Sequence, residues 1–527
     1  MKTIKYLLLS LLALGLAACY DDEGNYNYSE VPVIEVEANV PSGYLRGVDN
    51  FVFTPTITST QEGEITADNP NFEYACRLDT RLGSYFDDGQ TSHDMNPEGT
   101  QSFTYEFVEN AGSYEVVYSV KDKRTDVTTY FTYPITLSSS TYEGWMVLCN
   151  EGDDNRVRLD MITVVSGEDT IPTHNILTTA FPENHNATMI LYNKVQQFVD
   201  ARIFMCSETG SYELSWETLT TTAADNLANL LFLSDLGDDV PVRMASVGCG
   251  WPQGTGAFAA TTKNGDAYIY SADYDGAMFE SIANATEELG ERAYHVSPYI
   301  GNGMNRPGVM WEVSSSAALF FDTDNRRFMK WDSGQTDNIL YSVPEDHADF
   351  IPFGNVGQDL VYMEGTKYDI VYAVLDNGGS RSVLAVNLTG DQYVQQNYYE
   401  NITAENFNVA EHFTFHSLYP YMFYSYGDKV YTYNYATKSL QSITLPGEEI
   451  TMVKTDLFKT LYIDNIPEEV FNDQFFVMVG SYDPSTGDNN GGTFHRYRLN
   501  TSTGNLELVD EWDGFGKIVD VVYRERW

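Results

Sequence analysis

The chain has 527 residues, of which 30 are Lys or Arg and 76 are Asp or Glu, so its formal net charge is −46. A surface of this sign repels other polyanions, which excludes DNA, RNA and polyanionic glycans as partners. Hydrophobic residues make up 43% of the chain and the acidic residues stand singly among them, so we expect a folded protein rather than a disordered acidic one.

The first residues predict export and attachment to a lipid. A basic start, MKTIK, precedes an apolar run over 7–16 that is too short to span a bilayer, which is typical of a signal peptide. The sequence LAAC at 16–19 resembles the lipobox of bacterial lipoproteins. This resemblance implies that residues 1–18 are removed and that Cys19 is acylated, which would anchor the protein to a membrane. The alternative is an ordinary signal peptide with a chance cysteine.

An acidic segment, YDDE, follows the cysteine at 20–23. It resembles the signal that sends lipoproteins of Bacteroidota to the outside of the outer membrane, which implies a cell-surface location. The alternative is that these acids only solvate the chain near the lipid. We interpret residues 19–30 as a lipidated acidic tether.

Residues 31–138 predict a β-sandwich of immunoglobulin type, because six or seven short alternating strands follow one another there. The segment GSYEVVYSVKD at 112–122 matches the pattern GxYxVxxxVxD and resembles the PKD-like domains at the front of many Bacteroidota lipoproteins. Cys76 stands where that family usually has tryptophan, a departure that affects the family label and not the sandwich. Such domains act as spacers or adhesive modules.

Beyond residue 139 one pattern recurs, in which an apolar strand, a polar turn and an alternating aromatic strand follow one another every 50 to 60 residues or so. This period predicts the blades of a β-propeller. Seven hairpins carry it, at 144–162, 202–216, 256–272, 308–322, 369–388, 421–435 and 474–499.

A further apolar strand precedes each hairpin except the first, and we expect these strands to line a central channel. They lie at 187–192, 242–247, 293–299, 359–363, 410–416 and 450–455. One strand, 517–523, is left over at the C-terminal end. Pairing it with the first hairpin completes seven blades and leaves no open sheet edge. The sequence therefore predicts a seven-bladed propeller over 139–527, and the whole chain is expected to be all-β.

Helical periodicity is limited to 223–231 and 284–292, where we expect short helices. The cysteines that follow Cys19 are widely spaced and form no CxxC pair. We expect them to be buried free thiols, although a disulfide stays open outside the cytoplasm. They are Cys76, Cys149, Cys206 and Cys249.

No fingerprint of catalysis, metal binding or a cofactor is found, so we expect no catalytic residues, no metal and no cofactor. His412 and His416 share one side of a predicted strand, but without a third ligand they are interpreted as channel or core residues. The turn containing Asp483 and 488–490 and the turn at 322–325 offer oxygen ligands for calcium, and both also have the composition that a hairpin tip requires.

Binding is predicted in outline by three connections rich in Gly, Pro and Asn, at 248–256, 300–308 and 417–420. Aromatic faces beside amide and guanidinium groups suit a neutral sugar or a peptide. The alternative is that these residues pack one blade against the next, and the strand assignment places the loops on the rim that propeller ligands use less often. The candidate ligand-binding residues are Trp251, Tyr299, Asn302, Asn305, Arg306 and Tyr419.

Lipobox, PKD-like domain and propeller together resemble the PKD-like family lipoproteins of Bacteroidota. Such proteins commonly accompany Sus-type outer-membrane transporters, in which a TonB-dependent barrel has a lipoprotein lid. The resemblance implies a non-catalytic surface protein that captures oligosaccharide or peptide for uptake. One alternative is a propeller hydrolase or lyase acting on polysaccharide, which two carboxylates converging in a deep channel would favour. The other is a purely structural partner of the transporter.

Overall fold

The chain divides into two compact units, Met1–Leu137 and Ser138–Trp527, each of which is described here by itself. No helix among the described residues is long and apolar enough to cross a membrane. The computed structural model describes residues 32–80, 92–139, 141–166, 169–177, 183–193, 202–216, 218–230, 236–249, 256–271, 282–285, 291–302, 317–332, 337, 339–366, 370–388, 394–455, 476–486 and 489–524.

The first unit is built from antiparallel strands. A five-stranded sheet has the order β2(Gly43–Leu45)-β10(Val127–Ser138)-β9(Gly112–Asp122)-β6(Phe72–Thr80)-β7(Ser92–Asp94). A three-stranded sheet has the order β1(Ile34–Glu37)-β4(Thr56–Ser59)-β5(Gly63–Glu64), and β3(Asn50–Phe53) pairs with β8(Phe103–Glu106).

One hydrophobic core joins these sheets. Alternate residues of β6 and β9 are buried, as the period of a strand requires, and they meet Phe51, Phe53 and Ile57 from the smaller sheets. Cys76 is one of the buried positions of β6, and burial raises the pKa of its thiol to about 12. A thiol of this kind is a packing residue and not a reactive group.

The described part of the second unit contains seven antiparallel sheets that follow one another along the chain, with β11, β14, β17, β20, β24, β28 and β32 as their first strands. The first sheet has the order β13(Asp169–Thr173)-β12(Arg156–Ser166)-β11(Gly144–Glu151)-β36(Lys517–Arg524). The next three are β14(Ala187–Asn193)-β15(Arg202–Ser207)-β16(Tyr212–Leu214), β17(Pro241–Cys249)-β18(Gly256–Thr262)-β19(Ala267–Ser271) and β20(Gly301–Asn302)-β21(Ala317–Asp322)-β22(Arg327–Asp332)-β23(Tyr341–Ser342). The last three are β24(Asp359–Gly365)-β25(Ile370–Asp376)-β26(Arg381–Asn387)-β27(Gln395–Asn401), β28(Phe413–Phe415)-β29(Tyr421–Tyr426)-β30(Lys429–Asn434)-β31(Ser439–Thr444) and β32(Glu449–Thr455)-β33(Phe476–Tyr482)-β34(Gly492–Leu499)-β35(Leu506–Phe515).

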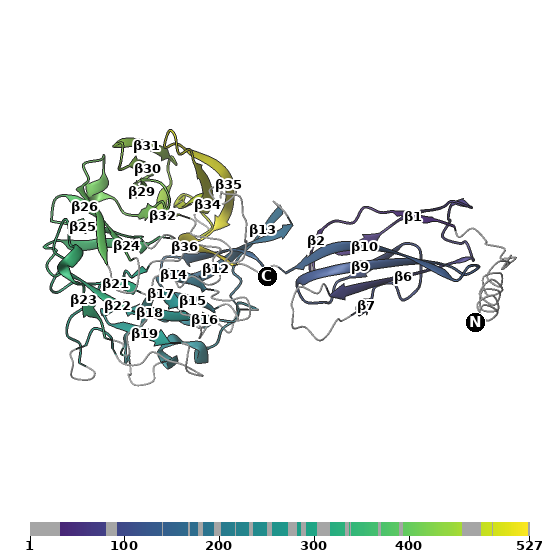
Figure 1. Cartoon of the computed structure of the whole chain (residues 1–527), viewed down its shortest axis with the longest axis horizontal. Helices are drawn as coiled ribbons and strands as arrows, with labels where there is room; N and C mark the ends of the chain where they lie inside the picture. Colours follow the sequence, from purple (N-terminus) through teal and green to yellow (C-terminus); the bar gives the residue numbers. More distant parts are fainter. Residues whose placement is uncertain are drawn as a thin grey trace, which may run out of the picture. The chain divides into compact units, whose positions relative to one another are not determined.

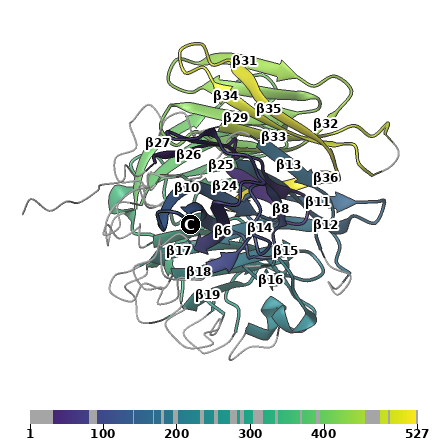
Figure 2. The same cartoon turned by 90° about the vertical axis from the view of Figure 1, so that its right-hand side faces the viewer.

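These sheets are arranged as in a β-propeller. Figure 1 shows β14, β17, β24, β32 and β36 near the middle of this unit, and β16, β19, β23 and β31 at its periphery. The strands β17, β18 and β19 follow one another outward in both views (Figures 1 and 2), in the order of their hydrogen bonding. Hydrophobic clusters form between neighbouring sheets, so each sheet buries one face against the next.

The last strand of the chain belongs to the first sheet of this unit. β36 pairs antiparallel with β11 in a register that runs from Gly144↔Arg524 to Asn150↔Lys517. Ile518 and Val521 are fully buried in a cluster that also contains residues of β33 and β34 from the last sheet. The two ends of the unit are thus held in one sheet, which leaves no unpaired edge on β11.

The two segments expected to form short helices differ in outcome. Residues 223–230 form two short 3-10 helices, Ala223–Asp225 and Leu227–Leu230, so the expectation of short helical structure is confirmed there. A reciprocal capping box between Thr222 and Asp225 caps the start of the first 3-10 helix, which ends at Asn226, where the backbone becomes extended. At 284–292 the described ends pair as a β-bridge between Ala285 and Arg292, and residues 286–290 lie outside the description.

The predicted inner strand at 293–299 is also absent as a strand. Val296 makes an isolated bridge to Asp322, and the innermost strand of this sheet is instead the two-residue β20. Pro298 is the physical reason, because it has no amide proton to donate to a neighbouring strand.

Candidate functional site

The innermost strands of all seven sheets line one central cavity of ≈ 290 Å³. Apolar side chains, among them four methionines, form much of its wall, and polar side chains stand among them. Each sheet contributes at least one lining residue from its innermost segment: Asp520 (β36), Met189 (β14), Arg243 (β17), Asn302 (β20), Glu364 (β24), Phe413 (β28) and Lys454 (β32). Concave apolar sites with a few fixed polar groups are where proteins bind small ligands.

Glu364 is held by hydrogen bonds from two neighbouring sheets. The Tyr362 hydroxyl donates to Oε2 at 2.6 Å, and the Thr414 hydroxyl and the Phe415 amide both donate to Oε1. Burial raises the pKa of Glu364 to about 7, although these hydrogen bonds and the charge of Lys454 favour the ionised form. The carboxyl group is therefore fixed in position and changes its charge near neutral pH.

Asp520 and Lys454 form an ion pair across the cavity wall. Lys454 Nζ lies 2.7 Å from Asp520 Oδ1 and also donates to the carbonyl of Val521 at 3.0 Å. The amide of Ile190 donates to Asp520 Oδ2 at 3.0 Å, so this carboxylate joins β36 to both β14 and β32. The pair is satisfied within the protein and fixes the point at which the last strand closes the unit.

Arg243 contacts the cavity wall in a different way. Its guanidinium carbon lies 4.7 Å from the centroid of the Tyr299 ring, and Tyr299 meets Tyr362 edge to face at 5.0 Å. All three side chains line the cavity. Stacking of this kind fixes the plane of a guanidinium and leaves its N–H groups available for hydrogen bonds in that plane.

The sequence-predicted binding residues are distributed as follows. Tyr299 and Asn302 line the central cavity, and the Asn302 amide donates to the carbonyl of Ser246 at 2.8 Å, which ties β20 to β17. Tyr419 is not among the lining residues; its ring lies 5.1 Å from that of His416 and packs against the core between the last two sheets. The other predicted residues, Cys19, Trp251, Asn305 and Arg306, lie outside the described part of the chain.

Sequence reasoning missed the charged residues of the cavity, although a usable signal exists. Arg243 and Lys454 are the only charged residues in the apolar segments 242–247 and 450–455, both of which are predicted to line the channel. A single charge within an inner strand must face either the channel or a buried partner. That rule selects both residues without knowledge of the structure.

The two histidines near β28 do not form a shared metal site. His412 lines the central cavity, and burial lowers its pKa. His416 Nδ1 accepts hydrogen bonds from the amides of Leu418 and Tyr419, so this nitrogen completes a turn and is not free to bind a metal. Burial lowers the pKa of His416 to about 4.

The turns proposed as calcium sites have other uses. Asp322 is fully buried and accepts hydrogen bonds from the amides of Asp324 and Asn325, while Arg327 forms an ion pair with it. The Asn490 side chain accepts a hydrogen bond from Arg158 at 2.7 Å. Asp322 and Asn490 therefore use side-chain oxygen atoms in contacts within the protein, and Asp488 lies outside the described residues.

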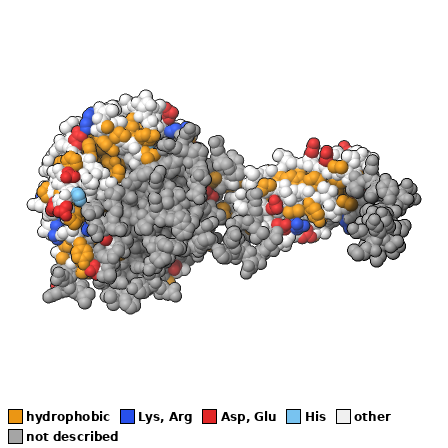
Figure 3. Space-filling model, viewed as in Figure 1, with side chains coloured by type: hydrophobic (Ala, Val, Ile, Leu, Met, Phe, Trp, Pro, Cys, Tyr) orange, Lys and Arg blue, Asp and Glu red, His pale blue; other side chains and the backbone are white. Residues whose placement is uncertain are grey.

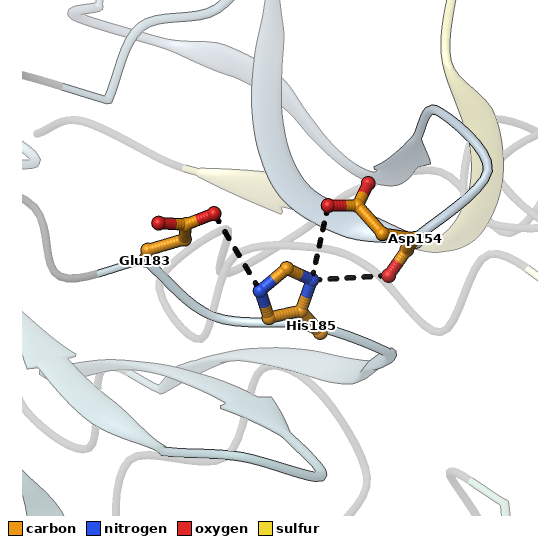
Figure 4. A group of neighbouring side chains, drawn as sticks. All are labelled: Asp154, Glu183 and His185. Carbon is orange, nitrogen blue, oxygen red and sulfur yellow. Dashed lines mark hydrogen bonds and ion pairs between the residues drawn. The ribbon is translucent and has the colours of Figure 1, made fainter.

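Asp154, Glu183 and His185 form a surface cluster in which ligand atoms lie within 4.8 Å of one another. Figure 4 shows the two carboxylates on opposite sides of the imidazole ring, with Glu183 facing Nε2 at 3.7 Å and Asp154 facing Nδ1 at 3.8 Å. His185 Nδ1 also lies 3.0 Å from the backbone carbonyl of Asp154. The three groups thus do not converge on one point where an ion would sit.

Ser481, His495 and Glu511 contact one another in the order of a catalytic triad, but the serine is not exposed to solvent. Ser481 Oγ lies 2.9 Å from His495 Nε2, and His495 Nδ1 lies 3.0 Å from Glu511 Oε2. Ser481 is fully buried, and its hydroxyl donates to Glu448. No substrate reaches that oxygen, so these residues link β33, β34 and β35 within one sheet.

The architecture defines an all-β protein with a β-propeller unit, and comparison with known proteins finds a family model that matches part of the chain. Residues 19–183 match the model of the PKD-like family. No curated protein sequence matches the chain.

Solved structures offer distant likenesses of the fold. The periplasmic gluconolactonase PpgL of Pseudomonas aeruginosa is 11% identical, with a TM-score of 0.41, over 72% of this chain and 98% of that chain. The Cps50 (Swd1) β-propeller domain of Myceliophteria thermophila is 9% identical, with a TM-score of 0.35, over 66% and 97%. An apocarotenoid oxygenase mutant of Synechocystis is 9% identical, with a TM-score of 0.34, over 94% and 96%. At these TM-scores the likenesses say nothing about what this chain binds.

Proposed function

We propose that this protein captures a small polar ligand in the central cavity of its propeller unit, without catalysis. One observation carries this proposal, namely that the innermost segments of all seven sheets converge on a single cavity with aromatic, methionine and fixed polar side chains. We take the seven sheets to be the blades of a seven-bladed propeller. Its axial cavity then has the size and lining that suit a small ligand.

The state of the polar groups supports binding. Glu364 and the pair of Lys454 and Asp520 already have their hydrogen-bonding partners, so the wall does not need to reorganise when a ligand enters. A preorganised wall lowers the entropic cost of binding. Tyr299 and Tyr362 add aromatic surface for the C–H faces of a sugar or for the side chain of a peptide.

We further propose where this capture takes place. The lipobox ending at Cys19 and its acidic follow-up support attachment to the outside of an outer membrane. Residues 31–138, as a sandwich of PKD or immunoglobulin type, would act as a spacer. The match of 19–183 to the PKD-like family is consistent with an accessory lipoprotein that delivers oligosaccharide or peptide to a Sus-type, TonB-dependent transporter.

The test is calorimetric titration of purified residues 24–527 with panels of short oligosaccharides and peptides. We expect at least one binder whose affinity falls about 10-fold in Tyr299→Ala, because the ring is a wall of the cavity. Tyr130→Ala is the matched control, since that ring is 59% exposed on the first unit and should not affect binding. Binding that survives Tyr299→Ala unchanged, or an absence of any binder, would contradict the proposal.

A hydrolase is the second candidate, because two carboxylates of the cavity have different surroundings. Burial raises the pKa of Glu364 to about 7, which suits a general acid, while Asp520 is paired with Lys454. Polysaccharides incubated with the protein would then release reducing ends, and Glu364→Gln would abolish the release without abolishing binding. An absence of release from any polysaccharide that binds would leave capture as the function.

The third possibility is a purely structural partner of the transporter. Affinity purification of the tagged protein from solubilised membranes would then recover the barrel or its lid. If the transporter copurifies equally with Tyr299→Ala, docking does not depend on the cavity.

A further inference from the structure

Arg243 differs from the other charged residues of the cavity wall in its lack of a protein partner. Glu364 is fixed by three donors, and Lys454 and Asp520 are paired with each other. No described residue accepts a hydrogen bond from the Arg243 side chain or forms an ion pair with it. The remaining carboxylate, Glu411, stands at the cavity's edge, where it is exposed. A half-buried guanidinium without a protein partner has N–H groups available for an anionic ligand.

The surroundings of Arg243 favour one kind of anion. The guanidinium stacks on Tyr299, and the edge of Tyr299 is in turn supported by Tyr362. A guanidinium held by its face presents a fork of parallel N–H donors, which matches the two oxygens of a carboxylate. This is a geometry for recognition rather than a flexible surface charge.

The charge of the cavity wall also limits the net charge of the ligand. Among the described lining residues, Arg243 is the one Lys or Arg without an ion pair, and Glu364, Asp520 and Glu411 are acidic groups of the same wall. Acidic side chains are also scattered over the face of the molecule drawn in Figure 3. A ligand with two or more negative charges, such as a phosphate dianion or an oligouronide, would meet more repulsion than one arginine compensates.

We propose that the captured ligand is a monoanion whose single carboxylate is bound by Arg243. This inference rests on the proposed function, and it names the ligand chemistry of the same cavity. The volume of ≈ 290 Å³ limits the bound part to about one sugar ring or two amino acid residues. The carboxylate belongs either to a sugar acid or to the C-terminus of a short peptide.

The experiment compares acids with their neutral amides by calorimetric titration of the wild-type protein. The probes are D-glucuronate and D-glucuronamide, D-galacturonate and D-galacturonamide, and the N-acetylated tripeptide Ala-Ala-Phe with a free or an amidated C-terminus. We expect at least one acid to bind about 10- to 100-fold more tightly than its amide, as the loss of a charge-assisted hydrogen bond implies. The pair that shows the difference distinguishes a sugar acid from a peptide.

Variants then test whether the difference in affinity between acid and amide depends on Arg243. We expect Arg243→Gln to remove the preference by weakening the acid far more than the amide, and Arg243→Lys to retain part of the preference. Arg156→Gln is the matched control, since Arg156 is an exposed surface residue paired with Glu151. It loses the same charge outside the cavity and should leave the preference intact.

The outcomes separate this inference from the proposed function. If amides or neutral sugars bind in a way that depends on Tyr299 but acids gain nothing, capture stands and the role of Arg243 is wrong. If an acid is preferred equally by wild type and Arg243→Gln, the carboxylate is bound elsewhere and the inference fails. If no probe of any pair binds, the inference fails for these classes. A failure of the broader neutral panel as well would remove the proposed function. If Arg243→Gln does not fold, Arg243→Lys takes its place, and an acid preference that is as large in Arg243→Lys as in wild type contradicts the inference.

Discussion

At the scale of single residues, Glu364 shows how burial controls charge in the cavity. Its carboxyl group is removed from bulk water, and three donors from two sheets hold it in place. Burial dominates and raises its pKa to about 7, whereas an unfolded chain gives glutamate a pKa of about 4.3. The folded protein therefore binds this proton more tightly than the unfolded chain does.

The sign of the consequence for stability follows from proton linkage. Because the folded state holds more protons between about pH 4.3 and pH 7, the contribution of Glu364 to the free energy of unfolding falls as the pH rises through this window. Between pH 5 and pH 8 we expect the free energy of unfolding to fall by roughly 1 to 2 kcal/mol more in wild type than in Glu364→Gln. This figure is smaller than the pKa shift alone implies, because water in the cavity weakens the effect.

Urea unfolding followed by tryptophan fluorescence measures this difference. All 7 tryptophans lie in residues 138–527, so the signal reports only the unit that contains the cavity. Glu98→Gln, an exposed residue of the first unit, is the control and should behave as wild type. Equal pH dependence in wild type and Glu364→Gln would show that this carboxyl group is not perturbed.

The candidate site was predictable from the sequence only in part. Tyr299 and Asn302 were selected as binding residues because of the loop that contains them, and both line the cavity. Glu364 lies one residue beyond the predicted strand 359–363, and nothing in the sequence marks it among so many acidic residues. Its importance comes from contacts with Thr414 and Phe415, which belong to the next sheet and are distant in the chain.

At the scale of elements, β36 closes the propeller unit. Ile518 is fully buried between the first and last sheets, beside Gly480 of β33. We expect Ile518→Ala to reduce the free energy of unfolding by about 2 to 5 kcal/mol, because it leaves a cavity at the closure. The tryptophan signal again measures it.

Leu508→Ala is the matched control for this closure. Leu508 lies on the edge strand β35, where it is 52% exposed, so its truncation should cost less than about 0.5 kcal/mol. If the two variants lose similar stability, β36 does not contribute to the closure as described.

The close contact between β20 and β24 explains why residue 365, in the cavity wall, is a glycine. A Cβ atom at Gly365 would lie 1.4 Å from the carbonyl oxygen of Asn302, so an alanine there must displace the backbone. We expect Gly365→Ala to destabilise this unit by about 3 kcal/mol and to weaken ligand binding together with it.

Gly379 provides the comparison for that substitution. It lies in an exposed turn, where a Cβ atom would meet nothing within 4 Å. Gly379→Ala should therefore leave the unfolding midpoint within the error of the wild-type value or raise it slightly. Two variants of equal stability would show that the sheets are not in contact at Gly365.

Strand patterns were predictable where side chains alternate, and unreliable where the local backbone chemistry intervened. The predicted inner strands 187–192, 242–247 and 450–455 correspond to β14, β17 and β32. The segment 293–299 has the same apolar character but contains Pro298, which cannot donate a backbone hydrogen bond to a neighbouring strand. An apolar pattern indicates which side chains can be buried, but it does not show whether each residue has an amide proton for a strand hydrogen bond.

At the scale of the whole molecule, the acidic composition and the cavity have complementary effects. A net charge of −46 favours solubility and repels polyanions, while Arg243, which has no ion pair with any described residue, lines the cavity. The sequence predicted the all-β class and the recurring sheets, because both follow from local patterns. It could not predict which inner side chains find partners, since those contacts join different sheets, as Asp520 does with Lys454 66 residues away and with Ile190 330 residues away.

The central claim is that the ligand binds in the cavity at the middle of the propeller unit, and methionine methyl NMR tests it most directly. Met189, Met244, Met363 and Met452 line the cavity, whereas Met95 is buried in the core of the first unit. With methyl-labelled methionine and the tightest-binding probe of the acid–amide panel, we expect the four cavity signals to shift and the Met95 signal to stay. Shifts that leave all four cavity methionines unchanged while the probe is bound would contradict the account.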